Sequence, residues 1–270
     1  EGSFIGHHIY TPKKGVAVHI NAYNFPVWGM LEKIAVNLVA GVPSVVKPAT
    51  ITSYLTEAVV KEIIASGILP EGSLQLVCGS AREILDFTNS QDVITFTGSA
   101  STGRMLKSHK NILEYSIPFN MEADSLNCSI LGEDAVPGTE EFDLFIKEVS
   151  KEMTVKAGQK CTAIRRAIIP ENLIEDVSKA LTARLEKVVI GDPREKEVRM
   201  GALASREQLE EVQGKIEELK ASTELLYHNT DLKLAGAASL EKGAFISPTL
   251  LLAKDPMNTP DVHSVEAFGP

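Results

Sequence analysis

The residues best suited to chemistry in this sequence surround Cys161. The cysteine follows a helical run and a glycine and precedes an apolar, strand-like run at 163–169, which predicts a thiol at a junction of regular elements. Lys156 and Lys160 are close enough in sequence to favour the thiolate, the form that attacks an electrophilic carbon. The alternative is a small buried hydrophobic residue, because that is the more frequent role of a free cysteine. The cysteine alone does not decide between these interpretations.

Two further features are typical of nucleotide binding. The turn Gly98-Ser99-x-x-x-Gly103 follows a predicted strand and would put backbone N–H groups and a hydroxyl at a helix N-terminus, which favours a phosphate. It lacks the full G-x-G-x-x-G spacing, so an ordinary glycine turn is the alternative. Lys47 ends an apolar strand, where its charge needs a nucleotide ribose, a phosphate or simply solvent.

Asn24 and Glu122 are candidates for the other groups of a covalent mechanism. The Asn24 amide precedes a Phe-Pro pair and would donate to an oxyanion, or else stabilise its own turn. Glu122 follows a strand-like run at 115–117 and has the chemistry of a general base, although most glutamates are only solvated. Cys128 is interpreted as a core residue.

The elements that must position these groups alternate between strand and helix in the first half of the chain. Strands are predicted at 15–20, 44–47, 74–78 and 93–96, and helices at 27–39, from 52 or 53 to 67, in a short stretch through 85, and after 103. This alternation predicts an α/β fold with a Rossmann-type, doubly wound parallel sheet. The polar motifs of this half follow the strands, where such sheets bind ligands.

The second half has a different pattern. After a linker at 132–140, an apolar helix face from Phe142 to Met153 leads to the Cys161 segment. Further elements are predicted as a strand at 163–169, helices at 173–185 and 205–219, the last one exposed, and a strand at 245–252. We therefore predict a dinucleotide-binding domain over 1–132 and a thiol-bearing, C-terminally incomplete α/β catalytic domain over 133–270.

Composition argues against several other classes of protein. The net charge of −9 disfavours a nucleic-acid partner. No apolar run has the length of a membrane span, and no signal peptide opens the chain. Three widely spaced cysteines without a CxxC pair fit a reducing cytoplasm and predict neither disulfides nor a metal site. The first residue is not methionine and the last residues stop within a motif, which indicates a piece of a longer protein.

Five ordered motifs resemble those of the aldehyde dehydrogenase superfamily, over essentially the whole chain. They are Asn24-Phe25-Pro26, Val46-Lys47-Pro48-Ala49, Phe96-Thr97-Gly98-Ser99 with Gly103, Gly158-Gln159-Lys160-Cys161, and Glu266-Ala267-Phe268-Gly269-Pro270. The segment 121–127 (MEADSLN) is similar to the corresponding segment in the aldehyde dehydrogenase domain of the bifunctional ring-opening proteins of phenylacetate degradation.

The resemblance implies a role for each motif. Cys161 would be the nucleophile, Asn24 would stabilise the oxyanion and Glu122 would be the general base. The family's usual E-L-G-G-K-S-P-N segment aligns that base with Asn120, whereas the nearby glutamate is Glu122. Glu122 precedes Cys161 by 39 residues, a longer interval than in ordinary members of the family. The cofactor-binding residues implied are Ile20, Asn21, Lys47, Ala49, Thr50, Gly98, Ser99, Gly103, Glu266 and Phe268.

Thr50 bears on the choice of cofactor. NAD-preferring members often have a glutamate there, and a carboxylate would repel the 2′-phosphate of NADP. We therefore expect an NADP-preferring enzyme, with NAD as the alternative cofactor. The resemblance also implies an aldehyde substrate, a semialdehyde carried on coenzyme A from aromatic acid breakdown, with phenylacetate favoured over benzoate, and a homo-oligomeric parent protein. Two alternatives stay open: a nucleotide-binding fragment without turnover, and an inactive homologue.

Overall fold

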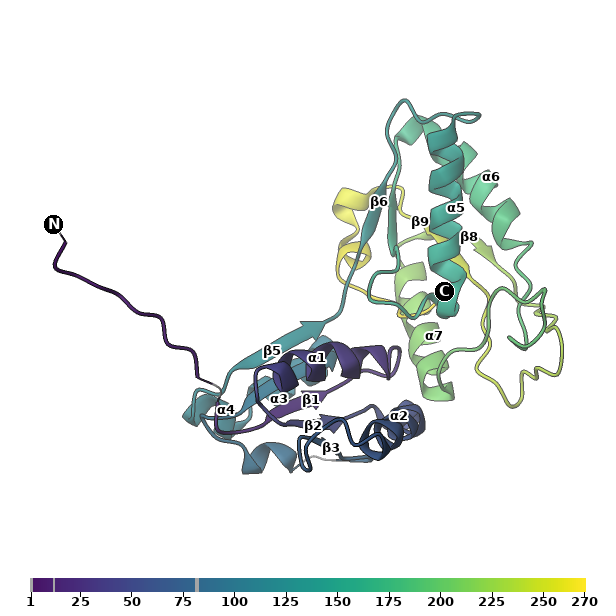
Figure 1. The fold of residues 1–270 in the computed structure, drawn as a ribbon. Helices are drawn as coiled ribbons and strands as arrows, with labels where there is room; N and C mark the ends of the chain where they lie inside the picture. The colour runs from purple at the N-terminus through teal and green to yellow at the C-terminus, as the bar shows by residue number, and fades with distance from the viewer. Residues whose placement is uncertain (1, 12, 81–82) are drawn as a thin grey trace. The chain divides into compact units, whose positions relative to one another are not determined.

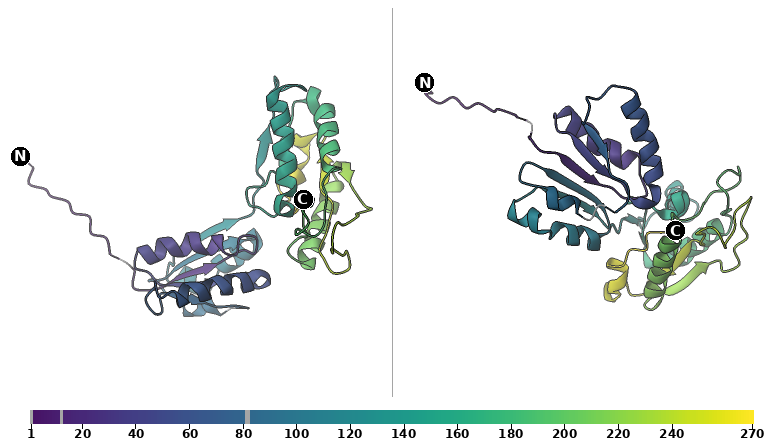
Figure 2. Two further views of the ribbon diagram at one scale, coloured as in Figure 1. Left: turned by 45° about the vertical axis from the view of Figure 1, so that its right-hand side comes forward. Right: turned by 90° about the horizontal axis from the view of Figure 1, so that it is seen from below.

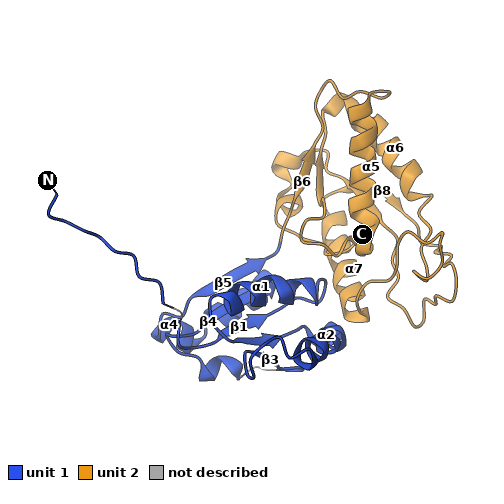
Figure 3. Cartoon of the chain, in the orientation of Figure 1, with its two compact units in different colours: residues 1–124 blue, residues 125–270 orange. Residues whose placement is uncertain are grey.

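The computed structural model describes residues 2–11, 13–80 and 83–270 (Figure 1). They form two compact units, Glu1–Asp124 and Ser125–Pro270 (Figure 3). This division comes earlier than the boundary at 132 expected from the sequence. The reason is the strand β6 (Cys128–Ile130), which pairs with a strand of the second unit, so the segment 132–140 is a connection inside that unit.

Unit 1 is built on a parallel sheet of five strands in the order β3-β2-β1-β4-β5. The chain winds outward from β1 to β3 and then returns to the other side of β1 with β4 and β5. The carboxyl ends of β1 and β4 therefore form the point at which the winding direction reverses. The strands are β1 (Ala17–Ile20), β2 (Ser44–Lys47), β3 (Leu74–Leu76), β4 (Val93–Gly98) and β5 (Phe119–Ala123).

Helices cover both faces of this sheet (Figure 2). Val18 is in register with Val45 and Ile94, so the side chain of Val46 lies on the opposite face from Val18. Val46 packs with Met30 and Val60, whereas Val18 packs with Leu85 and Ile112 in a separate cluster. The helices are α1 (Trp28–Val39), α2 (Ser53–Ala65), α3 (Ala100–Lys107) and α4 (Lys110–Glu114), with 3-10 turns η1 (Thr50–Thr52) and η2 (Ile84–Phe87). The predicted doubly wound fold is confirmed.

Unit 2 combines three long helices with two small sheets. The strand β6 pairs in parallel with β7 (Arg166–Ile168), and β8 (Glu224–His228) pairs antiparallel with β9 (Thr249–Leu252). One apolar core joins α5 to α6, and a second surrounds α7. The helices are α5 (Glu140–Thr154), α6 (Ile174–Leu185) and α7 (Arg206–Lys220), with 3-10 turns η3 (Val155–Gly158), η4 (Glu171–Leu173), η5 (Pro256–Asn258) and η6 (Pro260–His263).

Three predictions about local structure were wrong. The run at 115–117 is a turn that includes Ser116 at φ 50°, and the strand begins only at Phe119, so Glu122 lies within β5. Cys128 is exposed on β6. The helix at 205–219 is amphipathic and buries Val212, because its apolar residues recur at helical spacing among the Glu and Lys side chains.

Several element boundaries also differ. The predicted strands 163–169 and 245–252 are shorter, at β7 and β9, because only part of each apolar run has a pairing partner. The sequence patterns did not indicate α4 or β8. A short helix was expected to end at Leu85, and the structure has the 3-10 turn η2 there. Residues 81–82 of the expected helix lie outside the described part of the chain. No helix in the described ranges has both the length and the apolar character that crossing a bilayer requires.

Candidate active site

A run of left-handed residues shapes the turn that carries Cys161. Lys156, Ala157 and Gly158 have φ of 55°, 51° and 69°. A side chain on Gly158 would collide with the backbone carbonyl of Gly269, so glycine is required there by both conformation and space. Ala157 is 1% exposed and belongs to the core around α7, which holds the strained backbone in place. Cys161 itself is half-buried.

The side chain of Gln159 ties this turn together from inside. Its Nε2 donates to the Lys156 carbonyl over 2.9 Å, and its Oε1 accepts the Ala204 N–H over 2.9 Å. The residue is 6% exposed, so both amide groups are satisfied away from water. Glutamine at this position is therefore explained by two hydrogen bonds that fix the backbone before the cysteine.

Asn127, the residue before β6, supports the same turn. Its Nδ2 donates to the carbonyls of Cys161 over 2.6 Å and Ala163 over 3.0 Å. Ser125 Oγ donates to the Asn127 Oδ1 over 2.8 Å, which orients the amide. The Asn127 carbonyl accepts the backbone N–H of Arg165 over 3.0 Å. The segment 125–127 is thus a platform for the cysteine turn.

The two lysines near Cys161 have different electrostatic roles. Lys160 Nζ lies 2.7 Å from Glu152 Oε1, in a pair whose side chains are 18% and 16% exposed, so its charge is locally compensated. Desolvation and the Lys160 charge lower the pKa of Lys156, and the interaction with Cys161 acts in the opposite direction on that pKa. Lys156 therefore interacts electrostatically with the thiol.

The Glu266–Phe268 segment lies against the cysteine turn within unit 2. Glu266 Oε2 accepts the backbone N–H of Ser125 over 3.2 Å. Gln208 Nε2 donates to the Phe268 carbonyl over 3.2 Å and so ties the segment to α7. The segment meets the cysteine turn at Gly158, where an added Cβ would collide with the Gly269 carbonyl oxygen. Glu266 and Phe268 therefore belong to the segment that packs on the turn of Cys161, although they are far apart from it in sequence.

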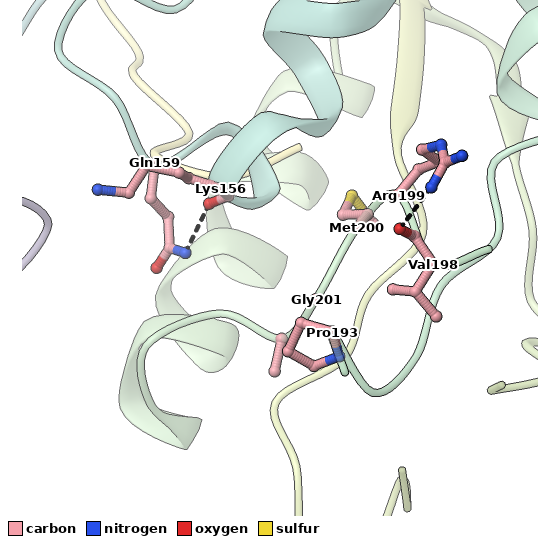
Figure 4. A pocket seen from close by; sticks show the side chains of 8 residues that line it. Lys156, Gln159, Pro193, Val198, Arg199, Met200 and Gly201 are labelled. Carbon is pink, nitrogen blue, oxygen red and sulfur yellow. Dashed lines mark hydrogen bonds between the residues drawn. The ribbon is translucent and has the colours of Figure 1, made fainter. Parts of the chain in front are cut away.

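A cavity of about 370 Å³ lies beside this turn in unit 2. Figure 4 shows Lys156 and Gln159 on one side of it and the segment from Val198 to Gly201, with Pro193, on the other. Arg199 Nη1 donates to the Val198 carbonyl over 3.1 Å. Cys161 does not line the cavity.

In unit 1 the predicted cofactor residues gather along one edge of the sheet. Ile20 and Lys47 are the last residues of β1 and β2, and the Asn21 N–H donates to the Lys47 carbonyl over 3.0 Å. Burial lowers the pKa of Lys47, and the nearby Cys78 opposes that shift. Ala49 precedes η1, and Thr50, which is exposed, begins it.

The glycine turn after β4 forms the expected helix N-terminus. Ser99 is the N-cap of α3, and its Oγ accepts the Thr102 N–H. A side chain on Gly103 would collide with Met121, so this glycine permits α3 to pack closely on β5. These features fit a phosphate cradle. One feature is unexpected: Asp124 Oδ1 already accepts the Ala100 N–H over 2.8 Å.

The loop that carries Asn24 is anchored by two threonines. Thr52 Oγ1 donates to the Tyr23 carbonyl over 3.2 Å, and the fully buried Thr56 donates to the Pro26 carbonyl over 3.1 Å. Asn24 is half-buried. Glu122, near the end of β5, is exposed. Both residues belong to unit 1, whereas Cys161, Glu266 and Phe268 belong to unit 2.

Sequence reasoning missed a half-buried lysine at the carboxyl edge of the unit 1 sheet. Lys33 Nζ, on α1, donates to Asn21 Oδ1 over 2.8 Å and to Thr97 Oγ1 over 2.7 Å. Burial lowers its pKa, with Glu32 and then Glu122 acting in the opposite direction. The helical spacing of α1 gives no sign of this role, because Lys33 stands among apolar residues that the core requires. Among the described residues, no cluster of three His, Cys, Asp or Glu side chains is arranged to hold a metal ion.

Comparison with known proteins defines the family. The family model of the aldehyde dehydrogenase family matches residues 5–270, and the chain belongs to this family. A 3,4-dehydroadipyl-CoA semialdehyde dehydrogenase from Aromatoleum evansii is 43% identical over 267 residues, which cover 99% of this chain and 52% of that protein. An aminoacetaldehyde dehydrogenase from Pseudomonas aeruginosa is 31% identical over 260 residues, or 95% of this chain and 49% of that protein.

Solved structures agree with this assignment. Betaine aldehyde dehydrogenase from Staphylococcus aureus, in complex with NAD+, superposes with a TM-score of 0.82 at 26% identity and covers 95% of this chain and 49% of its own. Succinic semialdehyde dehydrogenase from Streptococcus pyogenes, in complex with NADP+, shares the fold with a TM-score of 0.81 at 23% identity, over 96% of this chain and 54% of its own. The chain spans about half the length of the curated relatives it matches.

Proposed function

We propose that the protein containing this chain oxidises an aldehyde to the carboxylic acid with a nicotinamide dinucleotide, through a covalent intermediate on Cys161. The observation that carries the proposal is the turn of Cys161, which Asn127 and Gln159 fix and which lies against the Glu266–Phe268 segment. A half-buried thiol on so constrained a backbone is suited to nucleophilic attack.

The chain's own residues act at two stages. The Cys161 thiolate attacks the aldehyde carbon and forms a thiohemiacetal, whose oxyanion accepts hydrogen bonds from the Asn24 amide and the Cys161 N–H. When bound, the nicotinamide supplies the acceptor for the hydride that leaves this carbon. Glu122 then takes a proton from water, which attacks the thioester carbonyl, so that the acid leaves and Cys161 regains its thiol.

The two units divide these tasks in the proposal. Unit 1 would hold the dinucleotide at the carboxyl edge of its sheet, with Lys47 as the residue for the adenosine ribose and the Gly98–Gly103 turn as the site for the pyrophosphate. Unit 2 supplies the thiol, with Glu266 and Phe268 at the nicotinamide end. The glycine that lets α3 approach β5 and the serine cap support the first assignment.

For the substrate we propose a semialdehyde carried on coenzyme A. Support comes from the relative at 43% identity, which is named for 3,4-dehydroadipyl-CoA semialdehyde. For the cofactor we propose a preference for NADP, because Thr50 presents no negative charge to a 2′-phosphate. NAD is the alternative, as the solved relatives include complexes with either nucleotide.

The test is reduction of NADP+ or NAD+ by the purified protein with a CoA-linked semialdehyde. The Cys161→Ala variant should lose turnover, while Cys128→Ala, which removes an exposed thiol on β6, serves as the matched control. The Glu122→Gln variant should release one equivalent of reduced cofactor and then stall, because hydride transfer precedes hydrolysis. Full turnover by Cys161→Ala would overturn the assignment.

A nucleotide-binding protein without turnover is the second candidate. One observation favours it: unit 1 alone forms a five-stranded sheet with a separate core on each face. Binding of NADP by calorimetry, together with no product from any aldehyde and no reaction of Cys161 with a thiol reagent, would select this candidate over the enzyme.

A further inference from the structure

Arg165 joins two distant parts of the sequence. It lies just before β7, and its side chain is 8% exposed. Its Nη2 donates to the Gly158 carbonyl over 2.7 Å and to the Lys160 carbonyl over 3.3 Å. Its Nη1 donates to the Gly269 carbonyl over 2.8 Å. The guanidinium thus holds the backbone of the cysteine turn with one nitrogen and the backbone of the C-terminal segment with another.

The same guanidinium also faces two side chains of the C-terminal segment. Arg165 Nε lies 3.8 Å from Glu266 Oε1, in a pair whose acidic side chain is 12% exposed. The Arg165 Cζ lies 5.1 Å from the centroid of the Phe268 ring, within the range of a cation–π contact. Arg165 therefore touches the carboxylate and the ring that the proposed function places at the nicotinamide end of the cofactor.

The chemistry of arginine suits this task and that of other residues does not. Its planar fork presents several donors in fixed directions, so three backbone carbonyls and a carboxylate fix the group in one orientation. A lysine would keep the charge but has no fork. A neutral residue would leave the Glu266 carboxylate in a largely dry site without this cation.

We propose that Arg165 is a positioning residue for the cofactor, which sets the Glu266 carboxylate and the Phe268 ring at a fixed distance from the Cys161 turn. In this way it determines where the nicotinamide end of a bound dinucleotide lies relative to the thiol. This inference rests on the proposed function, because that function assigns Glu266 and Phe268 to the cofactor. In this proposal Arg165 acts through these two residues.

The experiment compares ligands that do and do not carry a nicotinamide. Calorimetry measures the dissociation constants of NADPH and of 2′,5′-ADP, which lacks the nicotinamide riboside, for the wild-type protein and the Arg165→Met and Arg165→Lys variants. The matched control is Arg206→Met, because Arg206 is exposed, does not line the cavity beside the cysteine turn and donates to the Leu240 carbonyl over 3.3 Å.

For Arg165→Met we expect NADPH binding weaker by about tenfold and 2′,5′-ADP binding within about twofold of wild type. Arg165→Lys should fall between, because it keeps a charge opposite Glu266 but loses the bonds to Gly158 and Gly269. In steady state, the KM for NADP+ should rise while the KM for the aldehyde stays constant. Arg206→Met should match the wild type in every measurement.

Three outcomes decide the matter. A wild-type protein that binds NADPH no better than 2′,5′-ADP overturns the proposed function and the inference with it. If the wild-type protein binds NADPH more tightly than 2′,5′-ADP and Arg165→Met shows the same ratio of dissociation constants, the inference alone is overturned. If Arg165→Met binds both ligands more weakly by the same factor and has a lower melting temperature, Arg165 stabilises the fold only, and the inference is rejected. If Arg165→Met does not fold, Arg165→Lys is judged by the same comparison.

Discussion

The side-chain amide of Asn127 donates to the backbone carbonyl of Cys161 over 2.6 Å, and to that of Ala163 over 3.0 Å. We expect Asn127→Ala to lower the free energy of unfolding by about 1–3 kcal/mol, because two half-buried carbonyls lose their donor. Denaturant unfolding measures this change. The control is Asn258→Ala, which removes an exposed amide bonded to Asp255 and should cost under about 0.5 kcal/mol. Equal losses in the two variants would contradict the platform role of Asn127.

Gly158 combines a left-handed φ of 69° with direct contact to the Gly269 carbonyl. Gly158→Ala should therefore destabilise the protein by about 2 kcal/mol or more, since the added methyl group must displace backbone. It should also change the rate at which a thiol reagent modifies Cys161, followed by peptide mass spectrometry. Gly201→Ala is the matched control, as a methyl group there meets no atom within 4 Å among the described residues. If Gly158→Ala is as stable as the wild type, the turn adjusts to the added methyl group and the prediction is wrong.

Thr50 is exposed at the start of η1 and is the proposed determinant of NADP preference. Thr50→Glu should lower kcat/KM for NADP+ by about tenfold or more relative to Thr50→Gln, because only the glutamate adds a charge that repels the 2′-phosphate. The efficiency with NAD+ should change little in either variant. A wild-type protein that already strongly prefers NAD+ would disprove the basis of this prediction.

Asp124 places a carboxylate at the N-terminus of α3, where a pyrophosphate is proposed to bind. Asp124→Asn keeps an acceptor for the Ala100 N–H, tolerates the φ of 42° and removes the negative charge. We expect dinucleotide binding to tighten by about threefold to tenfold at low salt, and the gain to shrink as salt rises. Asp86→Asn, which changes a carboxylate paired with His109 and Lys110, controls for net charge. If the affinity of Asp124→Asn for the dinucleotide is unchanged or lower, the phosphates do not bind at the N-terminus of α3.

His19 makes stability depend on pH. Its Nε2 accepts from Asn37 Nδ2 over 3.0 Å, and Thr95 Oγ1 lies 2.8 Å from Nδ1, in a fully buried site. Burial and then the Lys33 charge lower the pKa of His19 from 6.5 to about 4. Below about pH 6.5 the unfolded chain therefore binds a proton that the folded chain refuses until about pH 4. The contribution of neutral His19 to the free energy of unfolding is therefore fully present above about pH 6.5, and it decreases as the pH falls from about 6.5 to about 4.

The loss should approach about 3 kcal/mol at the acid end of the window. Denaturant unfolding at neutral pH and near pH 4.5, for wild type and His19→Gln, measures it. The glutamine variant should be less stable at neutral pH but lose less on acidification. Identical pH dependence in the two proteins would show that other groups cause the acid sensitivity.

The fold of unit 1 was predictable because its signals are local. Short β-branched runs alternate with helical spacing, and Gly41 and Gly67 adopt the positive φ that ends each helix. The second half gave weaker signals: the strand at Cys128 is three residues long, and its partner β7 lies far along the chain. A short strand with a distant partner has no local signature.

The candidate site shows the same contrast. Motif residues such as Cys161, Lys47 and Gly98 could be selected from residue type and order. Arg165 could not, because its role depends on carbonyls that long-range folding brings to it. The left-handed backbone at Lys156 and Ala157 was also hidden, since neither residue type favours that conformation and only the surrounding core imposes it.

The parallel pairing of β6 with β7 has a consequence for how this site tolerates change. Parallel strands start at the same end of a sheet, so Asn127, just before β6, and Arg165, just before β7, are neighbours. Their contact does not depend on the length of the chain that connects the two strands. That connection runs through the 132–139 loop, then α5, and last the cysteine turn. Insertions in the 132–139 loop should therefore leave the position of Cys161 unchanged, and we expect homologues to tolerate differences in length there.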